Sequence, residues 1–290
     1  MKCNLCPRSC NATREELSGN GFCKMPLMPK VALANLHFWE EPCISGENGS
    51  GTIFFSGCSL SCVYCQNYNI SQEGYGKIIS VERLAQIFKE LEEKGANNIN
   101  LVNPTHYTFA IKKALDIYKP NIPIVYNSSG YEKVEVLKSL EDYVDIYLLD
   151  LKYLSSDRAN EYSNAPDYPE YAKNAVLEAY RQKGECVFKN GIMQKGLIIR
   201  HLILPQGTAE AISVFDFVHK NTPNAYFSIM SQYTPLGKAI DLPKINRKIT
   251  KREYDKVLGV ILNSNFQNVF MQELNSSSAE YVPNFNLYGV

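Results

Sequence analysis

Two kinds of apolar pattern alternate along most of the chain. Short continuous apolar runs, typical of buried strands, are followed by longer segments in which apolar side chains recur every three or four residues, as in amphipathic helices. In residues 80–95, for example, Val81, Leu84, Phe88 and Leu91 fall on one helical face. The alternation predicts a protein built from repeated strand–helix units.

Six such units and a seventh strand can be placed along the sequence. The expected strands cover residues 52–55, 99–102, 122–129, 144–153, 196–205, 225–233 and 268–274. The expected helices cover residues 80–95, 107–118, 132–143, 169–184, 209–221 and 252–265. Buried strands that alternate with helices indicate an α/β fold, and the pattern leaves open whether the parallel sheet forms a barrel or a doubly wound sheet.

Local signals mark some of the element boundaries. Asn190-Gly191 is a strong signal for a two-residue hairpin turn. Thr250 and Glu253 have the spacing of a capping box, and Ser80 can cap the helix that follows it. We therefore expect a hairpin near residue 190 and helices that begin directly after residues 80 and 250.

The alternation divides the chain into three parts. Residues 1–49 do not follow it and form a Cys-rich N-terminal extension. Residues 50–275 carry the strand–helix units and are the expected core domain. Residues 276–290 have the composition of an extended C-terminal tail.

Composition and charge then narrow the function classes. The chain has 290 residues, 45% of them hydrophobic, with 30 Lys and Arg against 30 Asp and Glu. This balance gives no reason to expect nucleic acid or an anionic membrane as a partner. We find no signal peptide and no apolar run long enough to span a membrane, so we expect a cytoplasmic protein with reduced thiols. Nine cysteines in that compartment suggest metal ligands rather than disulfides.

Three of the cysteines directly follow the strand at residues 52–55. Cys58, Cys62 and Cys65 are spaced four and three residues apart, and no fourth cysteine follows them closely. Structural zinc and ordinary ferredoxin clusters take four ligands. Three ligands therefore suggest a [4Fe–4S] cluster with one iron open to a reactant. The alternative is that these cysteines are zinc ligands or buried side chains, as we expect for the isolated Cys43 and Cys186.

This motif resembles a known superfamily. CxxxCxxC after a first strand, with Tyr64 before the third cysteine, resembles the radical S-adenosylmethionine (SAM) superfamily. Nearly the whole chain resembles the pyruvate formate-lyase activating enzyme-like family, in the stretches "HFWEEPCISGENGSGTIFFSGCSLSCVYCQNYNIS", "INLVNPTHY", "YNSSGY", "DIYLLDLKY" and "IIRHLILP".

The resemblance implies a fold and a reaction. The fold would be a partial (β/α)6 TIM-like barrel with the cluster at its mouth, where barrel strands place active sites. Cys58, Cys62 and Cys65 would be the catalytic cluster ligands, and SAM would chelate the open iron. One electron, from a donor such as flavodoxin or ferredoxin, would cleave SAM to methionine and a 5′-deoxyadenosyl radical. The radical would take hydrogen from a substrate, for which a glycyl radical enzyme is one candidate.

Other polar residues at strand ends are candidates for binding SAM. They are Tyr64, Asn103, Thr105, Asn127, Ser128, Asp150, Lys152 and Arg200. Asp150-x-Lys152 resembles a motif of glycyl radical activating enzymes, and Arg200 can pair with the SAM carboxylate. The superfamily often has a Gly- and Glu-containing stretch at residues 103–105, where this chain has Asn-Pro-Thr. The structural alternatives are a strand-end ion pair for the charged residues and core packing for Tyr64.

The N-terminal extension carries a second group of cysteines. Cys3, Cys6, Cys10 and Cys23 are predicted to hold a metal, because so short a segment with few apolar residues needs a staple. The Cys3-x2-Cys6 spacing is common in zinc sites and favours structural zinc, whereas C-x2-C-x3-C also resembles iron–sulfur spacing. Zinc, an auxiliary [4Fe–4S] cluster and unliganded thiols all stay open.

A non-enzymatic function is the second hypothesis for the whole chain. An iron–sulfur or zinc protein that binds a partner or senses redox state would need no SAM pocket. The polar strand ends at Asn127, Asp150 and Arg200 argue against it, because a protein that only holds a cluster has no use for them.

Overall fold

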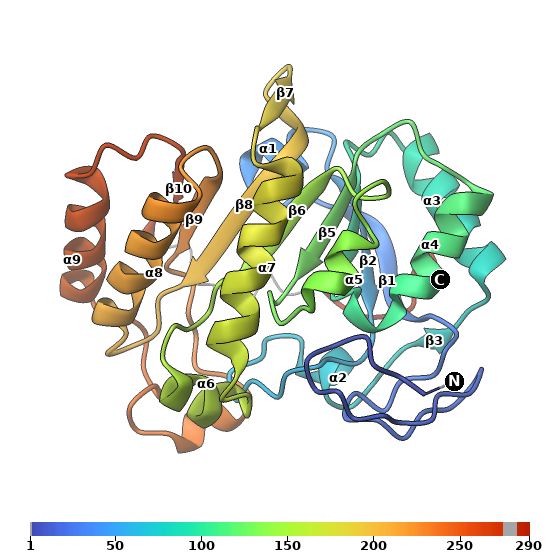
Figure 1. Cartoon of the computed structure of the whole chain (residues 1–290), viewed down its shortest axis with the longest axis horizontal. Helices are drawn as coiled ribbons and strands as arrows, with labels where there is room; N and C mark the ends of the chain where they lie inside the picture. Colours follow the sequence, from blue (N-terminus) through green and yellow to red (C-terminus); the bar gives the residue numbers. More distant parts are fainter. Residues whose placement is uncertain (1, 275–282) are drawn as a thin grey trace.

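The fold is built on one continuous, largely parallel sheet. A computed structural model describes residues 2–274 and 283–290. The strands follow the order β10-β9-β8-β6-β5-β4-β2-β1-β3, and β7 pairs with β8 (Figure 1). Their bounds are β1 Lys30–His37, β2 Ser50–Phe55, β3 Lys77–Ile78, β4 Ile99–Val102, β5 Ile124–Ser128, β6 Ile146–Asp150, β7 Val187–Lys189, β8 Ile192–Leu202, β9 Tyr226–Met230 and β10 Val269–Met271.

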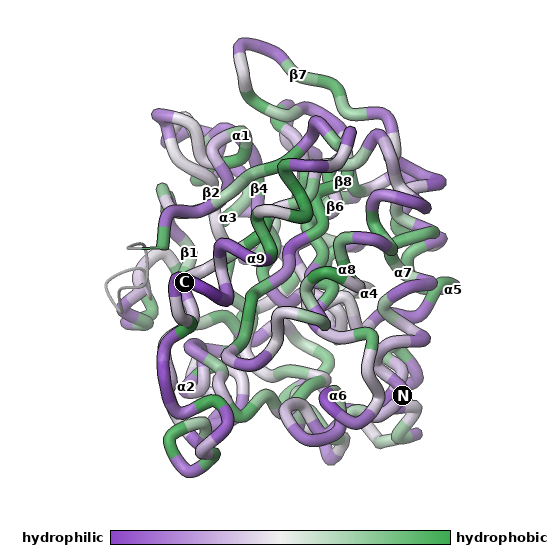
Figure 2. The backbone as a smooth tube through the Cα atoms, turned by 90° about the vertical axis from the view of Figure 1, so that its left-hand side faces the viewer, coloured by the Kyte–Doolittle hydropathy of each residue, from purple (hydrophilic) through white to green (hydrophobic). Residues whose placement is uncertain are grey.

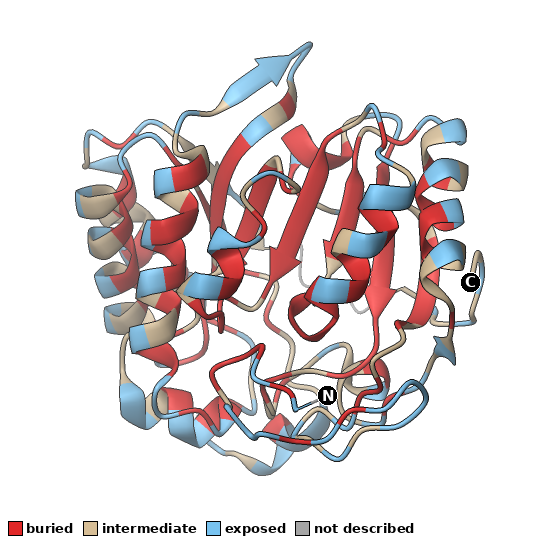
Figure 3. Cartoon of the chain, turned by 45° about the vertical axis from the view of Figure 1, so that its right-hand side comes forward, coloured by how far each residue is buried: buried red, intermediate tan, exposed pale blue. Residues whose placement is uncertain are grey.

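Helices cover the outer face of this sheet. Figure 1 shows α7 and α8 in front of the central strands, with α3 and α4 beyond one side and α9 beyond the other. The bounds are α1 Pro42–Ser45, α2 Tyr68–Ser71, α3 Val81–Glu93, α4 Thr108–Ile117, α5 Val134–Lys138, α6 Ser156–Ser163, α7 Tyr168–Lys183, α8 Thr208–Asn221 and α9 Lys251–Leu262, with 3-10 turns η1 Thr105–Tyr107 and η2 Gly237–Asp241. Each helix turns one buried face toward the strands and one exposed face outward (Figure 3).

The strand order confirms the expected fold class. Every pairing from β2 through β4, β5, β6, β8 and β9 to β10 is parallel. The sheet does not close, so the molecule is a partial barrel. The carboxyl ends of the parallel strands all lie at one edge, where α2 and α6 lie at the bottom of Figure 1. A site at this edge receives one loop from each strand.

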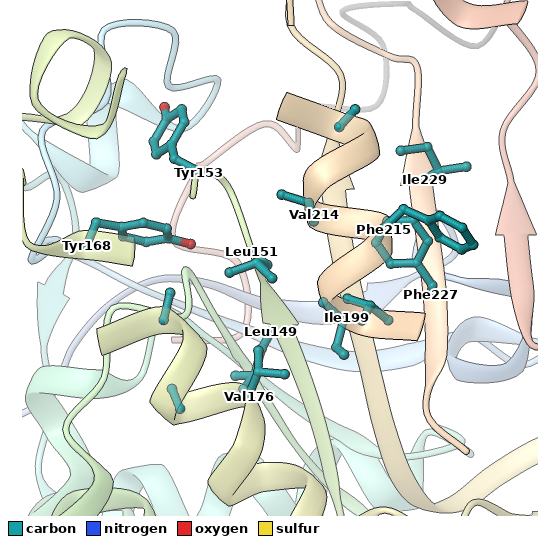
Figure 4. Close-up of a cluster of buried hydrophobic side chains, with 14 of the residues drawn as sticks. Leu149, Leu151, Tyr153, Tyr168, Val176, Ile199, Val214, Phe215, Phe227 and Ile229 are labelled. Carbon is teal, nitrogen blue, oxygen red and sulfur yellow. The ribbon is translucent and has the colours of Figure 1, made fainter. Parts of the chain in front are cut away.

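The largest hydrophobic core lies between the sheet and the helices. Leu149 of β6, Ile199 of β8 and Phe227 of β9 are fully buried under Val176 of α7 and Phe215 of α8 (Figure 4). Burying a large apolar side chain stabilises a fold by about 1.5–3 kcal/mol. This packing fixes the strands whose ends carry the polar residues described below.

The predicted local signals are present in the structure. Thr250 and Glu253 form a capping box at the start of α9, and the Ser80 side chain accepts a hydrogen bond from the Arg83 N–H. Asn190 and Gly191 both have positive φ angles between β7 and β8, as a two-residue hairpin turn requires. Apolar segments are concentrated in the strands (Figure 2). Of the helices in the described parts of the chain, none combines the length and apolarity that crossing a bilayer demands.

The structure also contains elements that the sequence pattern did not predict. β1 lies within residues 1–49 and pairs antiparallel with β2. α6 precedes α7 and has a mostly polar sequence. Residues 283–290 run beside β1, where Leu287 and Tyr288 exchange backbone hydrogen bonds with Ala32 and Ala34. The predicted boundary between core and tail, at residue 275, lies outside the described residues.

Candidate functional site

The loop after β2 carries Cys58, Cys62 and Cys65, all half-buried. Each sulfur has its own hydrogen-bonding neighbour: the Leu60 N–H lies 3.3 Å from Cys58 Sγ, Ser163 Oγ lies 3.0 Å from Cys62 Sγ, and Ser71 Oγ lies 3.2 Å from Cys65 Sγ. Hydrogen bonds to thiolate sulfurs tune the potential of an iron–sulfur cluster. Three oriented thiols therefore suit the predicted three-ligand cluster.

A cavity of about 420 Å³ adjoins this loop. It lies at the carboxyl ends of the strands, and its lining includes most of the residues predicted to bind the first cluster or SAM. These are Cys62, Tyr64, Cys65, Asn127, Asp150, Lys152 and Arg200. Its size falls in the range of small-molecule and cofactor pockets. The cavity thus has thiols at one end and room for a molecule beside them.

A charged network forms one wall of the cavity. Arg200 on β8 donates from Nε to Asp150 Oδ1 at 2.9 Å, from Nη1 to Glu40 Oε2 at 3.1 Å and from Nη2 to Asn127 Oδ1 at 2.7 Å. Lys152 Nζ donates to Asp150 Oδ2 at 2.6 Å. We call Glu40, Asn127, Asp150, Lys152 and Arg200 the cavity network. Parallel pairing of Asp150 with Arg200 in the β6–β8 register brings these side chains together.

Mutual contact keeps the charges of the cavity network in place. Burial alone would raise the pKa of Asp150, but the Lys152 and Arg200 charges outweigh it and hold that pKa below its ordinary value. Burial likewise opposes the charge of Lys152, and Asp150 more than compensates, so the pKa of Lys152 lies above its ordinary value. The wall is therefore ionised at neutral pH and can bind a charged ligand.

Two acidic residues of the cavity lie outside the predicted set. Glu40 joins the cavity network, and its Oε1 also accepts from Asn127 Nδ2 at 3.1 Å. Glu41 is buried, and its Oε2 has no hydrogen-bond partner among the residues that the structure describes. Burial raises the pKa of Glu41 and outweighs the opposing charge of Arg200. The sequence signal that could have pointed to these two residues is their position directly after Trp39, the single Trp of the chain.

Three of the predicted SAM-binding residues lie elsewhere. Asn103, Thr105 and Ser128 are not among the described side chains that line the cavity. Asn103 donates from Nδ2 to the Gly57 carbonyl, so it braces the start of the cysteine loop. Ser128 Oγ accepts from the Gly130 N–H at 3.1 Å. Roles in SAM binding for these residues stay predictions.

Thr105 belongs to a second buried polar group. Its Oγ1 donates to Glu132 Oε1 at 2.6 Å, and the Tyr126 hydroxyl donates to Glu132 Oε2 at 3.2 Å. All three residues are fully buried. We call Thr105, Tyr126 and Glu132 the Glu132 cluster. Hydroxyl groups satisfy its carboxyl, and no described residue forms an ion pair with it.

Tyr64 is placed between the cysteine loop and the core. It lines the cavity, and its hydroxyl hydrogen-bonds the Tyr153 hydroxyl, which in turn lies 3.0 Å from Ser163 Oγ. Ser163 Oγ also contacts Cys62 Sγ. Tyr64 therefore anchors the loop through its hydroxyl and presents ring surface to the cavity.

The four N-terminal cysteines line a separate small pocket. Within residues 2–274 and 283–290, no three His, Cys, Asp or Glu side chains lie at the spacing that would hold a single metal ion. This holds for the N-terminal cysteines and for the cysteines of the loop after β2.

Comparison with known proteins decides the family. Residues 52–200, which contain the cysteine loop and strands β4 to β6, match the model of the radical SAM superfamily. The chain belongs to the radical SAM superfamily. The superfamily implies a [4Fe–4S] cluster and SAM as cofactors and indicates an enzyme. The chain is also 33% identical over 266 residues to the uncharacterized protein MJ0674 of Methanocaldococcus jannaschii, covering 88% of this chain and 73% of that protein.

Solved structures share the fold. SuiB from Streptococcus suis, bound to S-adenosylmethionine, is 16% identical with a TM-score of 0.52, over 75% of this chain and 48% of that chain. SuiB bound to the precursor peptide SuiA is 18% identical with a TM-score of 0.50, over 75% and 47% of the two chains. The present chain thus spans about half the length of these solved proteins. At this identity the likeness concerns the fold alone.

Proposed function

We propose that this protein is a pyruvate formate-lyase activating enzyme-like radical SAM enzyme that removes hydrogen from a partner protein, with a glycyl radical enzyme as the candidate. The observation that carries the proposal is the single cavity that joins the cysteine loop to the cavity network. A protein that merely held a cluster would not need an ionised wall beside it. This second class of function is therefore less well supported by the site.

The chain's own residues bind and orient the cofactors. Cys58, Cys62 and Cys65 would hold the cluster, and their neighbours Ser71 and Ser163 fix the thiol orientations. When bound, the cluster and SAM supply one-electron cleavage of the sulfonium to methionine and a 5′-deoxyadenosyl radical. The carboxylate and amine of SAM are opposite charges, and the cavity network offers Arg200 and Lys152 for one and Asp150 and Glu40 for the other.

A macromolecular substrate suits the entrance of the cavity. Trp39 lines the cavity and is 64% exposed, and its neighbour Phe38 is 50% exposed. Adjacent exposed aromatic side chains are typical of surfaces that bind another protein or peptide. This supports a partner loop as substrate over a small molecule that the cavity would enclose.

SAM cleavage tests the enzymatic part of the proposal. Protein reconstituted anaerobically with iron and sulfide should release 5′-deoxyadenosine from SAM when a one-electron donor is supplied. A variant with Cys58→Ala, Cys62→Ala and Cys65→Ala should release none above background, because SAM cleavage needs the cluster. Cys43→Ala is the matched control, since Cys43 is a buried cysteine outside the cluster loop. Cleavage by the triple variant would show that these cysteines do not carry the reaction.

The partner needs a separate experiment. The reconstituted protein, SAM, an electron donor and a glycyl radical enzyme from the same cell should together give a glycyl radical signal in electron paramagnetic resonance spectra. Normal release of 5′-deoxyadenosine with no radical on any such partner would leave the enzyme class standing and overturn the partner.

A further inference from the structure

Four cysteines outside the lining of the cavity surround one pocket of their own. Cys3, Cys6, Cys10 and Cys23 line it together with apolar side chains such as Leu5 and Phe22. Cys3 and Cys6 are 6% and 9% exposed. All four are free thiols. Four reduced sulfurs directed at one apolar pocket are the donor set of a closed metal site.

The backbone of the N-terminal segment is shaped around these thiols. The Cys3 N–H donates to the Ala12 carbonyl at 2.8 Å, and the Ser9 N–H donates to the Cys6 carbonyl at 3.1 Å. A turn at Gly21 brings in Cys23, and a Cβ at residue 21 would lie 3.1 Å from Cys10 Sγ. Hence the segment folds back on itself and brings the four cysteines around one small enclosed pocket.

A buried positive charge adjoins the pocket. Arg14 is 2% exposed, and its Nη1 lies 3.8 Å from Cys3 Sγ. Its Nε donates to the Met25 carbonyl at 3.0 Å, so the guanidinium is held in position. A neighbouring cation favours the thiolate form that a metal needs. The negative charge of a four-thiolate site would be partly balanced here.

The spacing of the sulfurs distinguishes between metals. A zinc ion holds four sulfurs at about 2.3 Å from one centre, whereas the sulfurs of a [4Fe–4S] cluster bind four different irons and stand further apart. Among the described residues no three of these sulfurs are placed to share one metal ion, and this holds for the N-terminal cysteines as well as for Cys58, Cys62 and Cys65, for which the family implies a cluster. We propose that Cys3, Cys6, Cys10 and Cys23 hold a second iron–sulfur cluster, with all irons ligated by the protein.

The second cluster would adjoin the first cysteine loop. Ser59, directly after Cys58, also lines the N-terminal pocket. Arg8 Nε donates to the Ser59 carbonyl at 2.8 Å, and its guanidinium lies 4.0 Å from the centre of the Phe22 ring. A cluster that orders residues 3–23 would therefore also hold Arg8 against the loop that carries Cys58.

Metal analysis of the full chain tests the proposal. Each variant is produced anaerobically, reconstituted with iron and sulfide, desalted and assayed for iron, sulfide and zinc. The variant with Cys58→Ala, Cys62→Ala and Cys65→Ala should retain about four irons and four sulfides per chain. A second variant with Cys3→Ala, Cys6→Ala, Cys10→Ala and Cys23→Ala should lose about half of the wild-type iron. Cys43→Ala and Cys186→Ala, outside both groups, should lose none.

The metal content of the two variants distinguishes a cluster, a zinc site and the absence of a metal site. About one zinc and no iron in the first variant would overturn the cluster in favour of a zinc site, and neither metal would overturn the site altogether. If the second variant fails to fold, the first still decides, because it keeps all four N-terminal cysteines. The readout needs no SAM cleavage, so it is independent of the proposed reaction.

Discussion

The cavity network and the Glu132 cluster stabilise their buried carboxyl groups in different ways. In the cavity network, Arg200 and Lys152 compensate Asp150, and all three groups keep their charges. In the Glu132 cluster, hydroxyls donate to the carboxyl, and burial raises the pKa of Glu132 to about 7. One group is ionised and lines a cavity, whereas the carboxyl of the other is partly protonated at neutral pH and enclosed.

The difference in charge indicates different roles: the cavity network suits ligand binding, and the Glu132 cluster suits packing of the fold. A charged wall costs desolvation energy, and such buried charges are characteristic of sites that bind a charged ligand. A buried acid with satisfied hydrogen bonds specifies the local geometry and needs no ligand. We therefore expect changes in the cavity network to alter SAM affinity, and changes in the Glu132 cluster to alter stability alone.

Removing the central cation of the cavity network should have the largest effect. Arg200→Met leaves Glu40 and Asp150 without their shared partner, so we expect a loss of about 3–5 kcal/mol in the free energy of unfolding. Loss of a charge-assisted hydrogen bond to SAM should also lower its affinity by about tenfold to hundredfold. Urea unfolding and calorimetric titration with SAM measure the two effects.

A surface arginine provides the matched control. Arg181 also bridges two carboxylates, Glu141 and Glu178, but its side chain is 52% exposed. Arg181→Met should change stability little and SAM affinity not at all, because solvent screens the pair. Equal effects of the two substitutions would show that the cavity network is an ordinary set of ion pairs.

The Glu132 cluster should appear in the pH dependence of stability. Folding raises the pKa of Glu132 from an ordinary 4.5 to about 7, so the folded state binds the proton more tightly. The contribution of protonated Glu132 to the stability of the folded state is complete below pH 4.5. It is lost as the pH rises through 7. The side chain of Glu132→Gln cannot titrate. The free energy of unfolding of this variant, measured with urea and taken relative to wild type, should therefore be about 2–3 kcal/mol higher at pH 8 than at pH 5.

An exposed acid controls for the change of residue type. Glu170→Gln, at an exposed position of α7, should follow the wild-type pH profile. SAM affinity of Glu132→Gln should match wild type, since the cluster is closed to the cavity. A parallel pH profile for wild type and Glu132→Gln would mean that Glu132 is ionised in the folded protein.

The sequence predicts the part of the fold in which local pattern and tertiary role agree. The strand–helix units from Thr52 onward have continuous apolar strands because both faces of the sheet are covered. β1 was not predicted because it lies among Cys and Pro residues. Its extended conformation depends on pairing with β2. α6 escaped because only three of its residues are buried, so its sequence has no apolar stripe.

The same distinction holds for the site. Asp150, Lys152 and Arg200 stand out because charge is rare at the end of an apolar strand, and the structure brings them into contact. Glu40 does not follow an apolar strand. Its contact with Arg200, 160 positions away in the sequence, can be seen only in the folded protein. Thr105 follows a strand as a ligand-binding residue would, but its partner Glu132 could not be known from spacing.

Thr105→Val is the smallest and most discriminating change. Valine keeps the shape of the side chain and removes the hydroxyl that donates to Glu132 Oε1, so stability should fall by about 1 kcal/mol near pH 5. The loss should grow at pH 8, because Glu132 is then ionised and needs its donors more. SAM affinity, measured by calorimetry, should stay within error of wild type. Thr222→Val is the control, since Thr222 is a buried threonine whose hydroxyl donates to the Val218 carbonyl of α8. A drop in SAM affinity for Thr105→Val but not for Thr222→Val would return Thr105 to the cofactor site and remove the contrast between the two polar groups.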